Sequence, residues 1–172
     1  IALMDRKWFL KLMGMGSLGS IASRRSAIVN YPRNTIKPKR LEKGDTFGLV
    51  SPASRLPQKK QYDQIIQQVK DLGYKVKVGK NARERYGYLA GRDKKRAEDL
   101  NSMFADEEVD AIMPFRGGWG CNRILPLLDY DLIRKNPKIL VGFSDITSLL
   151  NALYTKTGLV TFHGPVGKVE WT

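Results

Sequence analysis

The chain has 172 residues, of which 42% are hydrophobic and 27% are charged, and these values suit a single globular domain. The formal charge of +13 is uneven, because residues 1–43 hold ten lysines and arginines against two acidic residues. One cysteine and one histidine exclude an intrachain disulfide and a cysteine-based zinc site. We therefore expect neither a metal ion nor another cofactor.

The first 22 residues have the pattern of an export signal. The charged segment DRKWFLK precedes an apolar stretch at 12–22, which is too short to span a bilayer as a helix. RKWFLK resembles a twin-arginine signal, with Lys7 in place of the second arginine. We expect an exported, periplasmic protein without a stable membrane span; the alternative is a cytoplasmic protein with a basic arm. Residues 23–43 are expected to link this signal to a folded domain at 44–172.

From residue 44 onward, short apolar runs alternate with longer amphipathic segments. This alternation predicts an α/β fold, with a mostly parallel sheet flanked by helices in a flavodoxin-like or Rossmann-like arrangement. The predicted strands are Thr46–Val50, Tyr74–Val78, Val109–Met113, Ile139–Val141 and Leu159–Thr161. The predicted helices are Gln61–Leu72, Asp93–Phe104, Asn122–Leu128 and Asp145–Tyr154. Ligands bind at the carboxyl ends of such strands, so the loops at 51–54, 116–120 and 142–145 should converge there.

Ser144 is the first candidate for chemistry. In KILVGFSDITSLLNALY it lies between an apolar strand and an amphipathic helix, where α/β hydrolases place a nucleophilic serine. Amides and the dipole at the start of that helix would stabilise negative charge beside the serine. The alternative is a plain helix N-cap, because Ile146 stands where the pattern G-x-S-x-G has its second glycine.

The segment FRGGWG supplies the second group of candidates. Its adjacent glycines allow close approach of the backbone to a ligand, although a glycine-rich turn is the simpler explanation. Arg116 could pair with a substrate carboxylate or form a surface salt bridge, and Trp119 could line a pocket or cover the loop. His163, in TFHGP, could act as the base for Ser144 or only bind backbone in a rigid turn.

Taken together, GDTFGLVSPAS, GYLAGRDKKRAEDLNSMFADEEVDAIMPFRGGWGCNRILPLLDY, ILVGFSDIT and TFHGP resemble the LD-carboxypeptidase family of serine peptidases. The resemblance covers residues 41 to about 167. Members of that family cut the bond between a diamino acid and a terminal D-alanine in cell-wall peptides, and relatives cleave peptide-nucleotide antibiotics and confer immunity. The resemblance therefore implies a muropeptide substrate that ends in a D-amino acid, and a homodimer for the full-length protein.

The same resemblance assigns roles to individual residues. It implies that Ser144 is the nucleophile and that the amides of Gly118 and Asp145 form the oxyanion hole. Arg116, Gly117 and Trp119 would border the substrate. The family's catalytic glutamate and histidine lie in a second, C-terminal domain, and His163 belongs to a different motif. We therefore expect this 172-residue chain to be the nucleophile-bearing part of the enzyme and to be inactive alone.

Two other classes of function remain open. A nucleic-acid or anion-binding module would use the basic surface, but most of the excess charge precedes residue 44, so we expect no nucleic-acid partner. A non-catalytic protein with the same fold would bind cell-wall peptides without cutting them.

Overall fold

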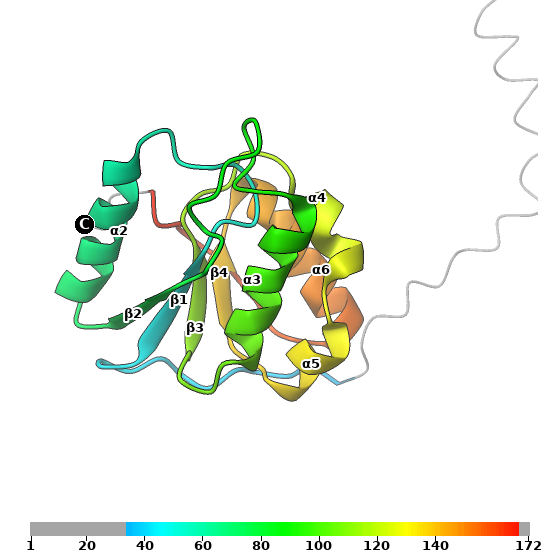
Figure 1. Cartoon of the computed structure of the whole chain (residues 1–172). Coiled ribbons are helices and arrows are strands. Elements are labelled where there is room, and N and C mark those ends of the chain that lie inside the picture. Colours follow the sequence, from blue (N-terminus) through cyan, green and yellow to red (C-terminus); the bar gives the residue numbers. More distant parts are fainter. Residues whose placement is uncertain (1–33, 169–172) are drawn as a thin grey trace, which may run out of the picture. The chain divides into compact units, whose positions relative to one another are not determined.

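The computed structural model describes residues 34–168, and Figure 1 shows its architecture. The expected export signal at 1–22 lies outside these residues, as does the first part of the expected linker at 23–43. No helix within the described range is long and apolar enough to cross a membrane.

Five parallel strands form the central sheet in the order β2-β1-β3-β4-β5. The chain steps outward from β1 to β2 and then returns to the other side of β1, so the direction of winding reverses between β1 and β3. This order is that of flavodoxin-like folds, and it confirms the predicted α/β class. The strands are β1 Thr46–Val50, β2 Lys75–Val78, β3 Ala111–Pro114, β4 Ile139–Gly142 and β5 Phe162–His163.

Helices cover both faces of the sheet (Figure 1). One face packs against the first long helix, which buries Tyr62, Ile65 and Val69 beneath it, and the remaining helices pack on the other face. Successive residues of β1 show this division. Leu49 belongs to the hydrophobic core beneath the first long helix, and Val50 belongs to the core beneath the other helices. The helices are α2 Lys59–Asp71, α3 Asp93–Ala105, α4 Cys121–Ile124, α5 Tyr130–Lys135 and α6 Thr147–Thr157, with short 3-10 turns η2 Leu125–Leu127 and η3 Ser144–Ile146.

The fifth strand lies later in the chain than predicted. The prediction of a strand at Leu159–Thr161 is wrong, because Leu159 instead forms an isolated parallel bridge with Ile36. Ile36 donates its amide to Gly158 O at 2.8 Å and accepts the amide of Val160 at 2.8 Å. Leu159 is therefore apolar because it is fully buried, not because it joins the central sheet. The same contacts place Ile36, inside the expected linker, against the folded domain.

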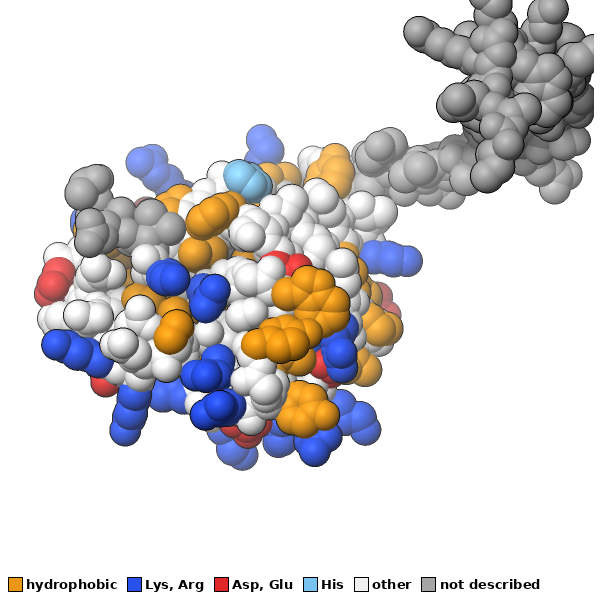
Figure 2. All heavy atoms as spheres, turned by 90° about the horizontal axis from the view of Figure 1, so that it is seen from above, with side chains coloured by type: hydrophobic (Ala, Val, Ile, Leu, Met, Phe, Trp, Pro, Cys, Tyr) orange, Lys and Arg blue, Asp and Glu red, His pale blue; other side chains and the backbone are white. Residues whose placement is uncertain are grey.

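All five strands end at the same side of the molecule, which is the top in Figure 1. The loops after β1, β2, β3 and β4 lie on this side, and Figure 2 looks onto it. The view shows Lys and Arg side chains spread across the surface, with several separate hydrophobic patches, the largest of them right of centre. This end of the sheet, called the carboxyl edge below, carries the candidate site.

Candidate active site

Ser144 lies in a strained turn at the carboxyl edge. It follows β4 as the first residue of η3, and its φ of 63° is the only positive φ of a non-glycine residue within 34–168. A side chain in this left-handed conformation costs about 1–2 kcal/mol relative to ordinary backbone. A serine held in such a turn between strand and helix is the geometry of a nucleophile elbow.

The N-cap alternative for Ser144 receives no support from the hydrogen bonds. The cap positions of η3 and α6 are Phe143 and Ile146, and neither end has a side-chain cap. Ser144 is exposed, and its Oγ makes no hydrogen bond in the described part of the chain. The hydroxyl is thus free to meet a ligand from outside the sheet.

The missing second glycine of the elbow pattern has a packing explanation. A Cβ added at Gly142 would lie 2.7 Å from Cγ2 of Ile146, whose side chain is fully buried. The close approach of strand and helix therefore occurs at Gly142, and Ile146 fills the space above it.

The RGGWG loop after β3 lies directly against Ser144. A Cβ on Gly117 would be 3.1 Å from Ser144 Cβ and 3.3 Å from its Oγ. At Gly118, φ is +111° and a Cβ would be 2.4 Å from the Oγ of Ser54. Gly118 is therefore required by space and by its backbone conformation, and a side chain at Gly117 would be tight against Ser144.

Ser54, from the loop after β1, holds the RGGWG loop in position. Its amide donates to Gly117 O at 3.3 Å, and its Oγ accepts the amide of Trp119 at 3.1 Å. Two of the three loops that the sequence predicts to converge are thereby joined by hydrogen bonds. They flank the reversal point between β1 and β3, where open α/β sheets bind ligands.

Asp145 connects the elbow to the following loop. Its Oδ2 accepts the amide of Cys121 at 2.9 Å, and its carbonyl accepts the hydroxyl of Ser148 at 2.8 Å. Burial raises the pKa of the Cys121 thiol, and the nearby Asp145 carboxylate raises it further. The thiol is therefore protonated at neutral pH and is no rival nucleophile to Ser144.

A shallow depression of about 360 Å³ opens in front of Ser144. Its two charged residues are Arg116 and Lys168, and both are cationic. The backbone of Lys168 is fixed by a hydrogen bond from its amide to Phe115 O at 2.9 Å. The remaining lining residues are Gly117, Gly118, Phe143, Ser144 and Val166. This depression can accept a small anionic group beside a serine hydroxyl.

Arg116 and Trp119 belong to the same loop and have different contacts. Arg116 donates through Nη1 to Arg55 O at 3.2 Å, so its guanidinium is anchored to the loop after β1. The Trp119 side chain is 54% exposed and meets Tyr88 edge to face, with 5.8 Å between ring centroids. Trp119 thus borders the carboxyl edge, although it does not line the depression at Ser144.

His163 stands beside the elbow without joining it. In β5 it is paired with Gly142, and the amide of Gly164 donates to Gly142 O at 3.1 Å. The His163 side chain is exposed, does not line the depression, and forms no hydrogen bond with Ser144. The geometry therefore gives His163 no role as the base for Ser144.

Sequence reasoning missed Arg96, which ties the loops of the carboxyl edge together. The Arg96 side chain is buried, and its guanidinium donates to Gly120 O at 3.0 Å, to Gly91 O at 3.2 Å and to Pro52 O. It also pairs with Asp93, one turn earlier in α3. An arginine in an amphipathic helix ordinarily indicates the solvent side, so spacing alone could not reveal this burial.

Within residues 34–168, no group of three or more His, Cys, Asp or Glu side chains is placed to hold a metal ion. The described residues bring a hydroxyl, loop amides and the cations of Arg116 and Lys168 to the site.

A parallel α/β sheet that presents a serine in a left-handed turn between strand and helix defines a hydrolase-type domain. The chain belongs to the family described as LD-carboxypeptidase N-terminal domain, whose model matches residues 47–164. The resemblance read from the motifs is thereby confirmed.

Similar proteins support the same assignment. A probable murein peptide carboxypeptidase from Bacillus subtilis is 50% identical over 130 residues, which are 76% of this chain and 40% of that protein. The crystal structure of an MccF-like protein from Bacillus anthracis matches with a TM-score of 0.74 and 38% identity, over 78% of this chain and 41% of that one. A muramoyltetrapeptide carboxypeptidase from Oxalobacter formigenes matches with a TM-score of 0.66 and 27% identity, over 73% and 41%. The chain thus spans about two fifths of the length of these relatives.

Proposed function

We propose that this chain is the nucleophile-bearing part of a serine carboxypeptidase that removes a terminal D-amino acid from peptidoglycan-derived peptides. The observation that carries the proposal is Ser144 itself, an exposed serine with a φ of 63° at the end of a parallel strand. Names of relatives that include murein peptide carboxypeptidase support the substrate class.

In the proposed reaction, Ser144 Oγ attacks the carbonyl carbon that precedes the terminal residue. The amides of Gly118 and Asp145 stabilise the negative oxygen, and neither amide is used in the turn and loop hydrogen bonds of the described residues. The carbon–nitrogen bond then breaks, the terminal amino acid leaves with a proton on its nitrogen, and water hydrolyses the acyl-enzyme.

A carboxypeptidase also has to recognise the free carboxylate one residue beyond the scissile bond. The two cations of the depression at Ser144 suit this task, because Arg116 presents a planar fork of donors and Lys168 a mobile point charge. We assign the terminal carboxylate to this pair. Gly117 and Trp119 would border the bound peptide.

The general base is assigned to residues outside the described range. Within residues 34–168, no side chain makes a hydrogen bond with Ser144 Oγ, and a serine nucleophile requires a base that accepts its proton. The proposal therefore includes inactivity of residues 34–168 alone. Export to the periplasm and dimerisation of the full-length protein are proposed with it, and cell fractionation and light scattering would test them.

The test is to incubate the full-length gene product with a murein tetrapeptide that ends in D-alanine and to measure free D-alanine. We expect stoichiometric release of that residue, with no release of further amino acids. Tight binding without release would instead favour a non-catalytic protein that binds cell-wall peptides. If the protein neither binds the peptide nor releases D-alanine, the proposal is overturned.

A further inference from the structure

We propose that Ser54 is a positioning residue for the reaction at Ser144: it fixes the direction of the Gly118 amide that would stabilise the negative oxygen. The inference rests on the proposed function, because it concerns the oxyanion hole of the same site. Ser54 does not line the depression in front of Ser144, so it acts through the RGGWG loop and does not touch the substrate.

Ser54 makes two hydrogen bonds to the RGGWG loop, and they fall on the two peptide planes that flank Gly118. The Ser54 amide donates to Gly117 O at 3.3 Å, which holds the plane that also contains the Gly118 N–H. The Ser54 Oγ accepts the amide of Trp119 at 3.1 Å, which holds the next plane. Gly118 joins the two planes with a φ of +111°. Because glycine has no Cβ to restrict its rotation, these two bonds set its conformation.

The first of these bonds determines where the Gly118 amide points. All peptide bonds within 34–168 are trans, and in a planar trans peptide the N–H is directed opposite to the C=O. Because Gly117 O is directed at the Ser54 amide, the Gly118 N–H is directed away from Ser54. Gly118 is exposed and lines the depression at Ser144. Its amide is therefore available to an oxygen of a ligand in that depression.

The RGGWG loop also contacts the candidate nucleophile. A Cβ on Gly117 would lie 3.1 Å from Ser144 Cβ and 3.3 Å from Phe143 O, so Gly117 contacts both serines of the site. A rotation of the loop would change the distance between the Gly118 amide and the oxygen that forms at the attacked carbon. An oxyanion donor has to lie about 2.7–3.1 Å from that oxygen, so a small displacement removes its effect.

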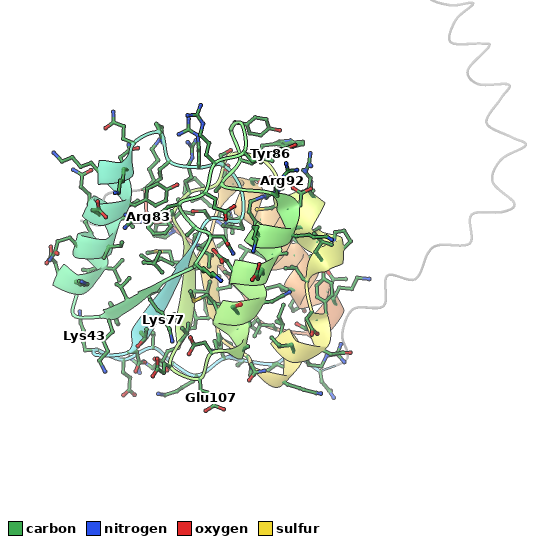
Figure 3. The ribbon with its side chains drawn as sticks, viewed as in Figure 1. Lys43, Lys77, Arg83, Tyr86, Arg92 and Glu107 are labelled. Atoms are coloured by element: carbon green, nitrogen blue, oxygen red, sulfur yellow. The ribbon has the colours of Figure 1, made fainter. Side chains whose placement is uncertain are left out.

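Ser54 is itself held from the side that faces away from the RGGWG loop. It forms an antiparallel bridge with Leu89, and the amide of the next residue, Arg55, donates to Tyr88 O at 3.1 Å. Figure 3 shows Tyr86, from the same segment as Leu89, at the carboxyl edge. A residue that is fixed by one segment can restrict the glycine of another.

The fold does not depend on the Ser54 hydroxyl. The buried guanidinium of Arg96 donates to both Pro52 O and Gly120 O, so it joins the loop after β1 to the end of the RGGWG loop at a second point. The backbone bond from Ser54 to Gly117 O also remains when the side chain is shortened. Ser54→Ala therefore removes one bond at the oxyanion hole and leaves the two loops joined.

The first test measures D-alanine release from a murein tetrapeptide by the full-length gene product. Loss of a whole oxyanion donor costs about 10²–10³-fold in kcat, and Ser54→Ala only loosens one, so we expect kcat to fall about 10- to 100-fold. KM should stay within about threefold, because the affected interaction is made in the transition state. Ser51→Ala is the matched control from the same loop, since the buried Ser51 hydroxyl has no hydrogen-bond partner among the described residues. It should keep kcat within about twofold of wild type.

A second measurement separates positioning from structural damage. In a phosphinate analogue of the tetrapeptide, a tetrahedral phosphinate replaces the scissile amide and carries a negative oxygen. We expect Ser54→Ala to weaken binding of this analogue by the factor by which kcat falls, and to leave binding of the tripeptide product unchanged. Ser54→Cys has nearly the same shape as wild type but accepts a hydrogen bond only weakly. It should show the same pattern, and it serves as the test if circular dichroism shows that Ser54→Ala is unfolded.

The outcomes distinguish this role from the proposed function. If the wild-type protein releases D-alanine and the Ser54 variants keep its kcat, or lose affinity for analogue and product alike, the role of Ser54 is wrong and the carboxypeptidase stands. If the wild-type protein releases no D-alanine, the proposed function fails, and labelling by diisopropyl fluorophosphate decides on Ser54.

In that labelling reaction the bond between Ser144 Oγ and phosphorus forms, fluoride leaves, and the hydroxyl proton passes to a base. The phosphoryl oxygen then takes the place of the carbonyl oxygen beside the Gly118 amide. Labelling of Ser144 that is about tenfold or more slower in the Ser54→Ala variant would support the positioning role. Equal rates in both proteins, or no labelling of the wild type, would overturn it.

Discussion

Replacement of Arg96 by methionine is predicted to destabilise the domain severely, because this one side chain serves four groups. Its guanidinium donates to three loop carbonyls and pairs with Asp93, and the residue is 1% exposed. Methionine has a similar length and is apolar, so Arg96→Met fills most of the space and removes the donors. The carbonyls of Pro52, Gly91 and Gly120 are then left without this partner.

The loss in free energy of unfolding is the sum of the hydrogen bonds removed, less the free energy that burial of the arginine charge costs the wild-type protein. A hydrogen bond from a charged donor contributes about 1.5–3 kcal/mol. The three bonds to carbonyls and the bond to Asp93 would together exceed about 5 kcal/mol. Removal of the buried charge offsets part of that loss, and Asp93, which is partly exposed, keeps its ion pair with Arg123. We therefore expect a loss of about 4 kcal/mol, a large share of the 5–15 kcal/mol typical of a domain.

Urea denaturation of the 172-residue chain, followed by circular dichroism, measures this loss. With a typical urea slope of about 2 kcal/mol per molar, the midpoint should fall by about 2 M. Arg92→Met is the matched control four residues earlier, because Arg92 only lies over the exposed ring of Tyr86 at 4.6 Å. It should cost less than about 1 kcal/mol. An Arg96→Met variant within 1 kcal/mol of wild type would refute the role assigned to Arg96.

Three further predictions test the surroundings of the site. Gly118→Ala should lower the free energy of unfolding by about 2 kcal/mol or more, because φ is +111° and the new Cβ would meet Ser54 Oγ at 2.4 Å. Urea denaturation measures this loss, with Gly87→Ala as the control. A Cβ at Gly87, where φ is +62°, meets nothing within 4 Å, so this variant should cost only about 1 kcal/mol of strain. Burial raises the pKa of the Cys121 thiol, so a disulfide reagent at pH 8 should modify the native chain at least about 100-fold more slowly than the unfolded chain, and equal rates would contradict its burial. Hydrogen bonds from Arg123 and Arg96 hold the pKa of Asp93 below its ordinary value, so its stabilisation is present at neutral pH and is lost as the pH falls through that lowered pKa. Asp93→Asn should therefore be less stable than wild type at pH 7, and the difference should shrink between pH 4 and pH 2; a constant difference would show that Asp93 acts other than through its charge.

The positions of β1 and of the two long helices could be predicted because their patterns are local. Thr46–Val50 is a short, mostly apolar run, and α2 and α3 repeat apolar residues at helical spacing. Convergence of the loops after β1, β3 and β4 followed from the topology, since parallel strands in one sheet end at one edge. By contrast, α5 spans only Tyr130–Lys135, which is too short for a helical period to be recognised.

The surroundings of Ser144, the position of the RGGWG loop and the burial of Arg96 depend on contacts between distant segments. Patterns along the sequence could therefore not predict them. The left-handed φ of Ser144 occurs where Ile146 packs closely over Gly142, and the RGGWG loop is bound by Ser54 from the loop after β1. Arg96 is buried where Gly91, just before α3, and two loops from distant parts of the chain, at Pro52 and Gly120, offer carbonyls to it. Leu159 was misplaced for the same reason, because its partner is Ile36, more than one hundred residues earlier.

The central claim is that Ser144 is the nucleophile of a D-amino-acid-releasing carboxypeptidase. The most direct measurement compares D-alanine release from a murein tetrapeptide by the full-length wild type and by its Ser144→Ala and Ser148→Ala variants. Ser148 is the matched control, because it lies four residues after Ser144, in α6, and its hydroxyl only donates to Asp145 O. We predict that Ser144→Ala lowers kcat by about 10³-fold or more while the protein stays folded, and that Ser148→Ala remains within about tenfold of wild type. A folded Ser144→Ala variant that releases D-alanine at the wild-type rate would contradict the account.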